Sequence, residues 1–493
     1  MFPPLIDLPP DLYRVEINDH PLAISSSVSA SVLEEAPTDI PWRYESMAIV
    51  DRAQGIGIIQ PEATYDALNI HSWHDAGFQG QGISIAVFDV EWFGVDWPQS
   101  ELAPVETHDC FAHRSCEPPI DTAHIRFGFE RGVHGFACAE IIRDLAPQAS
   151  LHLVRVNGHT SLQNAVDWAI RENIDIISMS LSFFNESFYD GTGPISALMD
   201  PLANNDIAMI TSAGNYAQQH FRSAFNDSDG DNFHDFDNSL GLPVYFREGR
   251  RRLNLLWDEF DLCGYNDLDL YVRNENGALI GRGTKEQTLQ QDNCHPSERI
   301  TIEITEEGWH YLQVYQKGNN GIPTFDIMAR GGFVYQGTTE HSIVDPGNHP
   351  NVLTVGAVRV DDYLHSSLEG FSSQGPNSFG LTKPDLVGPN GLTTLSYGPK
   401  NFFGTSASTP AVAGMFAVFM SGHPDLTILD GLDHLKWSAV SDDLFTSPTA
   451  QIGYGRARLP SVQSDIGCAG QGILILPMVL FSLRRRKNHH VLT

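Results

Sequence analysis

Short apolar segments of strand length alternate with helix-like segments over residues 66–225, and the pattern returns after about residue 345. The apolar segments lack strict alternation, which is typical of parallel strands buried on both faces. We therefore expect an α/β fold with a doubly wound parallel sheet covered by helices on both sides. The expected strands are 83–90, 150–156, 174–182, 206–215 and 351–360, and the expected helices are 134–145, 160–173 and 404–420. Thr160 and Gln163 have the spacing of a capping box at the start of one helix.

Between the two α/β stretches the helical pattern stops. Segments with β-type patterning occupy 251–260, 267–281, 298–316 and 325–330, and Asn276-Gly277 is a hairpin turn signal. We expect a small antiparallel β-sandwich inserted into the α/β domain. The expected organisation is an N-terminal arm or prosegment remnant (1–65), a first α/β part (66–225), an insert with an acidic loop and the sandwich (226–332), a second α/β part (333–462) and a C-terminal tail (463–493).

Charge and cysteine content narrow the function classes. The chain has 30 Lys and Arg against 61 Asp and Glu, a formal net charge of −31, so it repels polyphosphate and is not expected to bind nucleic acid. Cys110 and Cys116 lie close together, and Cys263 and Cys294 share a later region. These two spacings fit one disulfide between Cys110 and Cys116 and another between Cys263 and Cys294, in an oxidising compartment. Six reduced thiols in a cytosolic protein would also fit. Cys138 lies in an apolar helical segment and is expected in the core.

The two ends of the chain differ. The N-terminus has no basic start and no long apolar run, so no secretory signal peptide is visible. Near the other end, the apolar segment 472–483 is followed directly by the cations of 484–487. Twelve helical residues span about 18 Å, less than the roughly 30 Å of a bilayer core. An apolar run followed by a basic cluster nevertheless indicates a membrane-inserting tail rather than a buried helix.

An acidic loop at 226–238 is a candidate metal site. Asp227, Asp229, Asp231 and Asp235 fall at positions 1, 3, 5 and 9 when Asp227 is counted as the first. Calcium takes several hard oxygen ligands from flexible loops, and closely spaced carboxylates repel one another without a cation. The loop lacks the final glutamate of an EF-hand, because position 12 is Asn238. We expect calcium here, with a solvated acidic turn as the alternative.

Several polar residues stand where the expected topology would bring them together. Asp89 ends the first buried strand, His134 opens a helix, and Ser406 follows Gly404-Thr405 at the start of an apolar helix. The carboxyl ends of parallel strands and the starts of the following helices meet at one sheet edge. A serine at a helix N-terminus becomes a nucleophile when a base is near. Each residue alone also fits a structural role. Asn215 ends another expected strand, and four such residues at one sheet edge are less expected by chance than any one of them.

These segments resemble the subtilisin-like serine protease family over about 66–225 and 340–460. The matching stretches are ISIAVFDV, HGFACAEIIRDLAPQASLHLVRV, DIISMSLS, AMITSAGN, FSSQGP with KPDLVGP, and GTSASTPAVAG. The resemblance implies a serine endopeptidase that cleaves polypeptides through an acyl-enzyme, with Ser406 as nucleophile, His134 as base and Asp89 orienting the imidazole. By the same resemblance, the Asn215 amide and the Ser406 backbone N–H would stabilise the oxyanion.

The resemblance also implies where a substrate binds. Ser180, Leu181 and Ser182 correspond to the segment that pairs with an extended peptide as an added β-strand. Ala213 and Gly214 would help to line the pocket for the residue before the scissile bond.

The chain departs from the family pattern near two of these residues. Asp89 is followed by Val90-Glu91 instead of a small residue and glycine, which makes Asp96 the alternative acid. On the helix after His134, Phe136 and Glu140 replace residues that are common in the family.

Two other functions remain open. GTSASTP also resembles the sedolisin family of acid serine peptidases, which use a glutamate in place of the histidine and an aspartate in place of the oxyanion asparagine. The chain could also be a surface-displayed binding protein whose catalytic domain is inactive.

The remaining parts carry weaker resemblances. Residues 239–332 are similar to β-sandwich modules of secreted peptidases, where they could hold substrate, stabilise the fold, bind carbohydrate or have no binding role. Gly467-Cys468, the apolar run and the arginine cluster resemble bacterial C-terminal sorting signals. We therefore expect a monomer that is secreted or attached to the bacterial cell envelope, with its tail in the membrane.

Overall fold

The α/β part is built on a seven-stranded sheet. The computed structural model describes residues 62–92, 102, 105–118, 120, 132–238, 240–259, 265–287, 295–318, 321–440 and 448–462. The strand order of this sheet is β16-β15-β5-β4-β1-β3-β2, and all neighbouring strands are parallel. The strands are β1 (Ser84–Asp89), β2 (Glu106–Asp109), β3 (Ser150–Arg155), β4 (Ile176–Met179), β5 (Ala208–Ser212), β15 (Val352–Arg359) and β16 (Leu386–Asn390).

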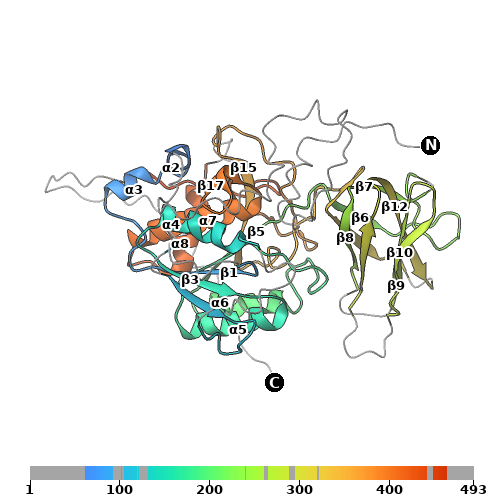
Figure 1. Ribbon diagram of the computed structural model, residues 1–493, viewed down its shortest axis with the longest axis horizontal. Helices are drawn as coiled ribbons and strands as arrows, with labels where there is room; N and C mark the ends of the chain where they lie inside the picture. The colour runs from blue at the N-terminus through green and yellow to red at the C-terminus, as the bar shows by residue number, and fades with distance from the viewer. Residues whose placement is uncertain are drawn as a thin grey trace, which may run out of the picture.

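Helices cover both faces of this sheet, which confirms the expected fold class. Successive residues of a strand point to opposite faces, so Ile85 and Val87 pack in one core cluster while Ala86 and Phe88 pack in another. The first cluster contains residues of α4 (His134–Leu145) and α7 (Thr405–Ser421). The second contains residues of α5 (His159–Arg171) and α6 (Met199–Asn204), which lie on the other side of β1 in Figure 1. The remaining helices are α2 (Glu62–Leu68), α3 (His71–Asp75), the 3-10 helix η7 (Ser196–Leu198) and α8 (Ile428–Ser438).

The capping-box prediction for α5 is wrong. The helix begins at His159, and its N-cap is Gly158, whose φ of 86° lies in the left-handed region. The hydroxyl of Ser161 instead accepts from the Asn157 backbone N–H at 2.6 Å and donates to the Gly158 carbonyl at 3.0 Å. Glycine takes this backbone conformation without steric cost, so the N-cap is Gly158, two residues before Thr160.

The inserted segment forms two packed antiparallel sheets, ordered β10-β9-β12-β7-β14 and β11-β8-β13-β6. The strands are β6 (His220–Ala224), β7 (Leu242–Phe246), β8 (Gly249–Trp257), β9 (Asp267–Arg273), β10 (Leu279–Gly283), β11 (Ser297–Ile304), β12 (Gly308–Lys317), β13 (Thr324–Arg330) and β14 (Gly332–Val334). Gly277, with φ of 79°, lies in the turn between β9 and β10, where Asn276-Gly277 predicted a hairpin. The sandwich strands extend a few residues beyond 226–332 at both ends, because β6 and β14 complete the sheets.

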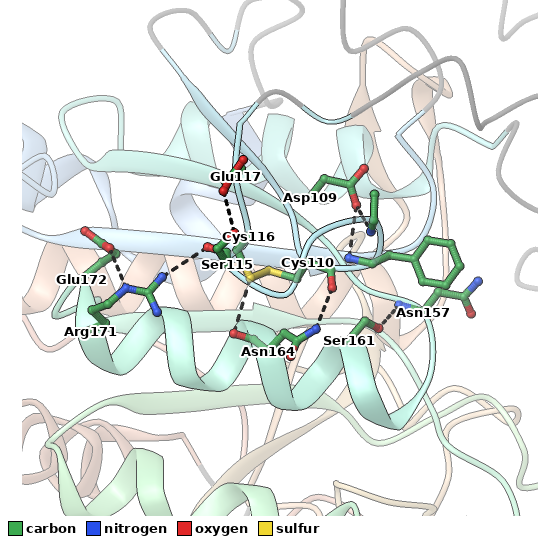
Figure 2. Close-up of a disulfide and its surroundings, with 12 residues drawn as sticks. Asp109, Cys110, Ser115, Cys116, Glu117, Asn157, Ser161, Asn164, Arg171 and Glu172 are labelled. Atoms are coloured by element: carbon green, nitrogen blue, oxygen red, sulfur yellow. Dashed lines mark hydrogen bonds and ion pairs between the residues drawn. A yellow bond between two sulfur atoms is a disulfide. The ribbon is translucent and has the colours of Figure 1, made fainter.

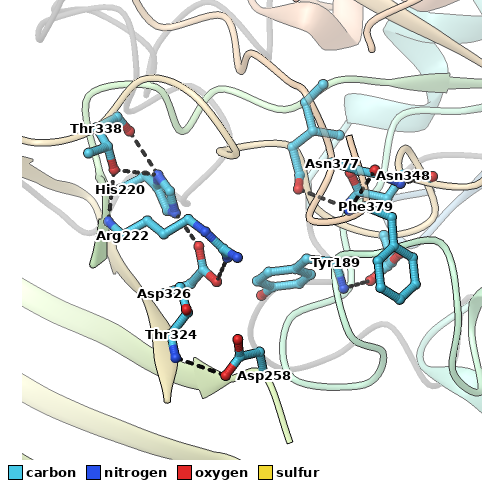
Figure 3. Close-up of polar contacts among 12 residues, drawn as sticks. Tyr189, His220, Arg222, Asp258, Thr324, Asp326, Thr338, Asn348, Asn377 and Phe379 are labelled. Atoms are coloured by element: carbon cyan, nitrogen blue, oxygen red, sulfur yellow. Dashed lines mark hydrogen bonds and ion pairs between the residues drawn. The ribbon is translucent and has the colours of Figure 1, made fainter. Parts of the chain in front are cut away.

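The sandwich packs directly on the α/β part. Asn185 donates to the Glu298 carbonyl at 2.9 Å, and Arg299 donates to the Phe184 carbonyl at 2.7 Å. A buried cluster spans the junction and contains Phe184, Tyr189, Tyr216, Leu256, Met328 and Val344. Figure 3 shows the neighbouring polar network, in which the Asp326 carboxylate on β13 contacts both His220 and Arg222 on β6.

A disulfide fixes the loop after β2. Cys110 and Cys116 are bonded, as the spacing predicted, and both are buried. Asn164 of α5 donates to the Cys110 carbonyl at 3.1 Å, which holds the loop against the helix (Figure 2). Cys138 is a free, buried thiol. The expected bridge between Cys263 and Cys294 lies outside the described residues.

The predicted terminal features also fall outside the described part of the chain. These are the arm up to residue 61 and the tail at 463–493. Within the described ranges, no helix has the length and apolar character needed to cross a bilayer.

Candidate active site

Asp89 and His134 form a buried pair at the carboxyl edge of the sheet. Asp89 is the last residue of β1, His134 is the first residue of α4, and Asp89 Oδ2 lies 2.7 Å from His134 Nδ1. The other carboxylate oxygen accepts the backbone N–H groups of Val90 at 2.8 Å and Glu91 at 3.0 Å. Val90 and Glu91 contribute only their backbone N–H groups to these bonds, so their unusual side chains do not disturb the turn. Asp96 lies outside the described residues.

The Asp89 carboxylate sets the state of the imidazole. Burial lowers the pKa of His134, but the charge and hydrogen bond of Asp89, together with the charge of Glu91, outweigh it and raise the pKa above its ordinary value. Because Nδ1 faces the carboxylate, Nδ1 carries the proton in the neutral ring and Nε2 is the basic nitrogen. The edge of the His134 ring meets Phe402, with 5.6 Å between ring centroids.

Gly135 permits the close approach of α4 to β1. A Cβ at this position would lie 2.9 Å from the Asp89 Cβ and 2.8 Å from the Trp92 ring. Such contacts are shorter than real Cβ atoms show, so a side chain here would push the helix away from the strand. Only glycine therefore fits at position 135 when α4 lies this close to β1.

Ser406 lies in the first turn of α7 and is buried. Pro410 stands four residues later in the same helix and has no N–H, so the Ser406 carbonyl lacks its usual helical partner. That carbonyl instead accepts from the Ser180 hydroxyl at 3.3 Å and lies 3.6 Å from the Cys138 thiol. The proline thus makes the Ser406 backbone available to two other segments of the site.

The Cys138 contact locates Ser406 relative to the histidine. Cys138 is one turn beyond His134 on α4, and its sulfur shares a group with Asp89 and His134 whose polar atoms all lie within 4.8 Å of one another. Because this sulfur also contacts the Ser406 backbone, Ser406 packs on the α4 face that carries His134. Burial raises the pKa of the Cys138 thiol well above its ordinary value, so this thiol stays protonated.

Asn215 is oriented by its oxygen. Asn215 Oδ1 accepts from the Thr405 backbone N–H at 2.9 Å and from its hydroxyl at 3.0 Å. The amide nitrogen turns toward Gly404, where an added Cβ would lie 3.0 Å from Nδ2. The amide donor of Asn215 therefore faces the N-terminal end of α7, next to Ser406.

The segments expected to bind substrate border the same place. Ser180, Leu181 and Ser182 follow β4 directly and are partly exposed. Ala213 is buried, and Gly214 has a φ of 100° and donates its N–H to the Thr405 hydroxyl at 3.2 Å. The structure thus brings both segments to the start of α7, and their roles toward substrate stay predictions.

Glu140 has a positioning role that sequence reasoning missed. Its buried carboxylate accepts from the Ser396 backbone N–H at 2.9 Å and from the Ser396 hydroxyl at 2.8 Å. Ser396 lies between β17 (Leu392–Thr394) and β18 (Gly398–Phe402), so Glu140 anchors the hairpin that places Phe402 against His134. The partners are 256 residues apart in the chain, and only the departure from the family pattern marked Glu140 in advance.

The acidic loop brings together three of the four expected ligands. Oxygens of Asp227, Asp229 and Asp231 lie within 4.8 Å of one another. Asp235 is not part of this group, because its Oδ2 accepts from the Ser228 backbone N–H and lies 3.2 Å from the Asn226 amide. The expected four-residue set is therefore reduced to three.

Comparison with known proteins agrees with this geometry. The serine protease AprX of Bacillus subtilis (strain 168) is 31% identical over 212 residues, which cover 38% of this chain and 43% of that protein. Subtilisin E of the same organism is 26% identical over 154 residues, covering 29% of this chain and 36% of that protein. The chain thus spans less than half the length of these relatives. The structure of the Clostridium perfringens CspB protease has the same fold, with a TM-score of 0.58, 18% identity and coverage of 80% of this chain and 97% of that one.

The family profile Peptidase_S8, described as the subtilase family, matches residues 80–238 and 284–455. The matched ranges contain Asp89, His134, Asn215 and Ser406. Because the match extends over more than half of the sequence and over all four of these residues, the chain belongs to the subtilase family.

Proposed function

We propose that this protein is a serine endopeptidase that hydrolyses polypeptides. The observation that carries the proposal is the Asp89–His134 pair at 2.7 Å, packed with the N-terminal turn of α7 that presents Ser406. A carboxylate that holds one imidazole nitrogen, beside a serine at a helix start, is the arrangement that activates a hydroxyl for acyl transfer.

In the proposed reaction, His134 Nε2 removes the Ser406 hydroxyl proton as Oγ attacks the scissile carbonyl. The Asn215 amide and the Ser406 N–H donate to the resulting oxyanion, and Asp89 stabilises the imidazolium. His134 then gives its proton to the leaving amine, which departs and leaves an acyl group on Ser406. A water molecule, deprotonated by His134, hydrolyses this ester and restores the serine hydroxyl.

The substrate is proposed to bind as an extended strand. Ser180, Leu181 and Ser182 continue from the end of β4, where a peptide backbone can add by main-chain hydrogen bonds. Ala213 and Gly214 border the pocket for the residue before the cut. The Ser180 hydroxyl already contacts the Ser406 carbonyl at 3.3 Å, which supports a location beside the nucleophile.

The site favours this mechanism over a sedolisin-like acid peptidase. That chemistry needs a glutamate as base and an aspartate at the oxyanion, whereas this chain has His134 bonded to Asp89 and Asn215 bonded to Thr405.

We propose further that the protein works outside the cytoplasm, in a secreted or envelope-attached form. The Cys110–Cys116 disulfide supports an oxidising compartment. The apolar and basic tail at 472–487 would supply the membrane contact.

A fluorophosphonate probe tests the proposed nucleophile. We expect the protein to be labelled, because the activated Ser406 hydroxyl attacks phosphorus as it attacks a carbonyl. Ser406→Ala should abolish labelling, and Ser421→Ala, at the other end of α7, should retain it. A folded wild-type protein that takes no label would contradict the enzyme and favour a binding protein.

Asn215→Ala tests the oxyanion role. Loss of the amide donor should lower kcat about 10²–10³-fold with little change in KM, because the donor acts mainly on the developing charge. Thermal unfolding of the variant checks that loss of the Thr405 contact has not unfolded the site. An unchanged kcat in the folded variant would disprove the assignment.

The acid limb of the pH–rate profile tests His134 as the base. Activity should rise with pH through the raised pKa of His134, because only the neutral imidazole accepts the serine proton. Glu91 helps to raise this pKa, so Glu91→Gln should move the limb to lower pH. Glu117→Gln, at an exposed carboxylate bonded to Ser115, is the matched control and should leave the limb in place. An optimum near pH 4 would instead favour the acid-peptidase alternative.

We propose that calcium binds in the acidic loop through Asp227, Asp229 and Asp231. Their oxygens are close enough to share one ion, and a divalent cation would remove their mutual repulsion. Asp227 also accepts from the backbone N–H groups of Gly230 at 2.7 Å and Asn232 at 3.0 Å. These bonds hold the loop in a shape that keeps the three carboxylates together.

Adding Ca²⁺ to protein freed of divalent ions should raise the melting temperature. When free Ca²⁺ is about 100 times its Kd, binding to the native state alone raises the free energy of unfolding by about 2.7 kcal/mol. Asp229→Asn should remove the response, and Asp235→Asn should keep it because Asp235 lies outside the cluster. A melting temperature that does not respond to Ca²⁺ would refute the site.

A further inference from the structure

A second group of metal-ligating side chains lies on the edge of the main sheet, on β2 and β3. Glu106 and His108 are two residues apart on β2, so they project from the same face of the strand. His152 on β3 is the register partner of Glu106, which brings its side chain to that face as well. The parallel pairing of two strands thus gathers two imidazoles and one carboxylate.

The distances between these groups are those of ligands around one ion. His108 Nε2 lies 3.4 Å from His152 Nδ1, and Glu106 Oε2 lies 3.8 Å from the first nitrogen and 3.5 Å from the second. Good hydrogen bonds between such groups are shorter, about 2.7–3.2 Å. Bonds of roughly 2.0–2.2 Å to tetrahedral zinc place neighbouring ligand atoms about 3.3–3.6 Å apart. The separations of 3.4 Å and 3.5 Å match the edges of that tetrahedron, and the third, 3.8 Å, is slightly longer, whereas all three exceed the length of a good hydrogen bond.

The surroundings orient the two rings. His108 Nε2 and His152 Nδ1 face each other, so a nitrogen of each ring points toward the centre of the group. Trp168 of α5 packs on His108 at 4.4 Å and on His152 at 5.7 Å between ring centroids. A packed outer wall that holds the ligating rings in place is a feature of built metal sites.

The charges also suit a cation. An imidazole at its ordinary pKa is mostly neutral at pH 7, which is the form that binds a metal ion. Glu106 adds one negative charge, and Glu172 at the end of α5 acts electrostatically on both rings. Arg171 is paired with Glu172 at 3.3 Å and donates to the Ser115 carbonyl, which holds the end of α5 on the disulfide loop (Figure 2).

We propose that Glu106, His108 and His152 bind a divalent transition-metal ion, with Zn²⁺ as the ion whose ligand preferences fit best. Two imidazole nitrogens and one carboxylate favour zinc over calcium, which takes oxygen ligands. The Glu106 side chain is 72% exposed, so solvent reaches the open fourth position. The site lies on the α5 face of the sheet, opposite α4 and α7, and is separate from both the proposed triad and the acidic loop. A bound ion would tie β2 to β3 and stabilise the sheet edge.

Zinc binding to the full chain tests this proposal independently of peptidase activity. The Ser406→Ala protein, freed of metal, is titrated with Zn²⁺ by calorimetry and with Co²⁺ by visible absorption, where tetrahedral coordination gives intense bands. We expect one ion per chain and a raised melting temperature with Zn²⁺. Glu106→Gln and His152→Gln should each weaken binding at least about tenfold, since even outer contacts of metal sites contribute that much.

His365→Gln is the matched control, because His365 and Asp362 form an exposed imidazole–carboxylate pair at 2.9 Å. This variant should bind Zn²⁺ as the parent does. Absence of one-to-one binding in the parent would overturn the site. Binding that neither Glu106→Gln nor His152→Gln weakens would also overturn it, because the ion would then lie elsewhere. Since Glu106 is exposed, its replacement should not affect folding, which melting of the metal-free variant checks.

Discussion

The buried hydrogen bond between Asp89 and His134 is the interaction on which the active-site arrangement depends. Removing a carboxylate from water costs several kcal/mol, and the cost is offset only when its oxygens find donors. Here one oxygen takes two backbone N–H groups and the other takes the imidazole. The fixed carboxylate then determines which nitrogen of His134 is basic. It also requires β1 and α4 to approach so closely that only glycine fits at position 135.

The nucleophile is positioned by backbone chemistry as much as by side chains. Pro410 removes the helical donor for the Ser406 carbonyl, and Ser180 and Cys138 take that place from the end of β4 and from α4. Asn215 fastens the other side of the turn through Thr405. Three segments that are distant in the chain are therefore joined to one helix turn, which explains how the site keeps its geometry around a long insertion. The sandwich packs against the α/β part at Phe184 and Asn185.

The two faces of the sheet carry different groups of polar side chains. On the face covered by α4 and α7, the carboxyl ends of the strands hold the groups proposed for peptide hydrolysis. The α5 face holds two imidazoles beside a carboxylate, at the short edge strand β2. The disulfide loop connects this edge strand to α5, so the proposed metal would reinforce an edge that has a partner strand on only one side.

The sequence by itself predicted the parallel sheet and the insertion, because apolar strand segments, helix starts and turn residues have strong local signals. The residues Asp89, His134, Asn215 and Ser406 were selected through the resemblance to subtilisin-like proteases, since each of them alone also fits a structural role. Cysteine spacing favoured the Cys110–Cys116 bridge, with reduced thiols as the alternative, and the structure contains the bridge. Local sequence patterns were less informative where backbone conformation sets the start of a helix or where a residue far along the chain supplies the contact. Gly158 rather than Thr160 starts α5, and β2 is too short and polar to stand out. Only the tertiary structure paired Glu140 with Ser396, removed Asp235 from the acidic cluster and brought His152 to Glu106 and His108. Strand register and loop geometry, which no local window contains, set these contacts.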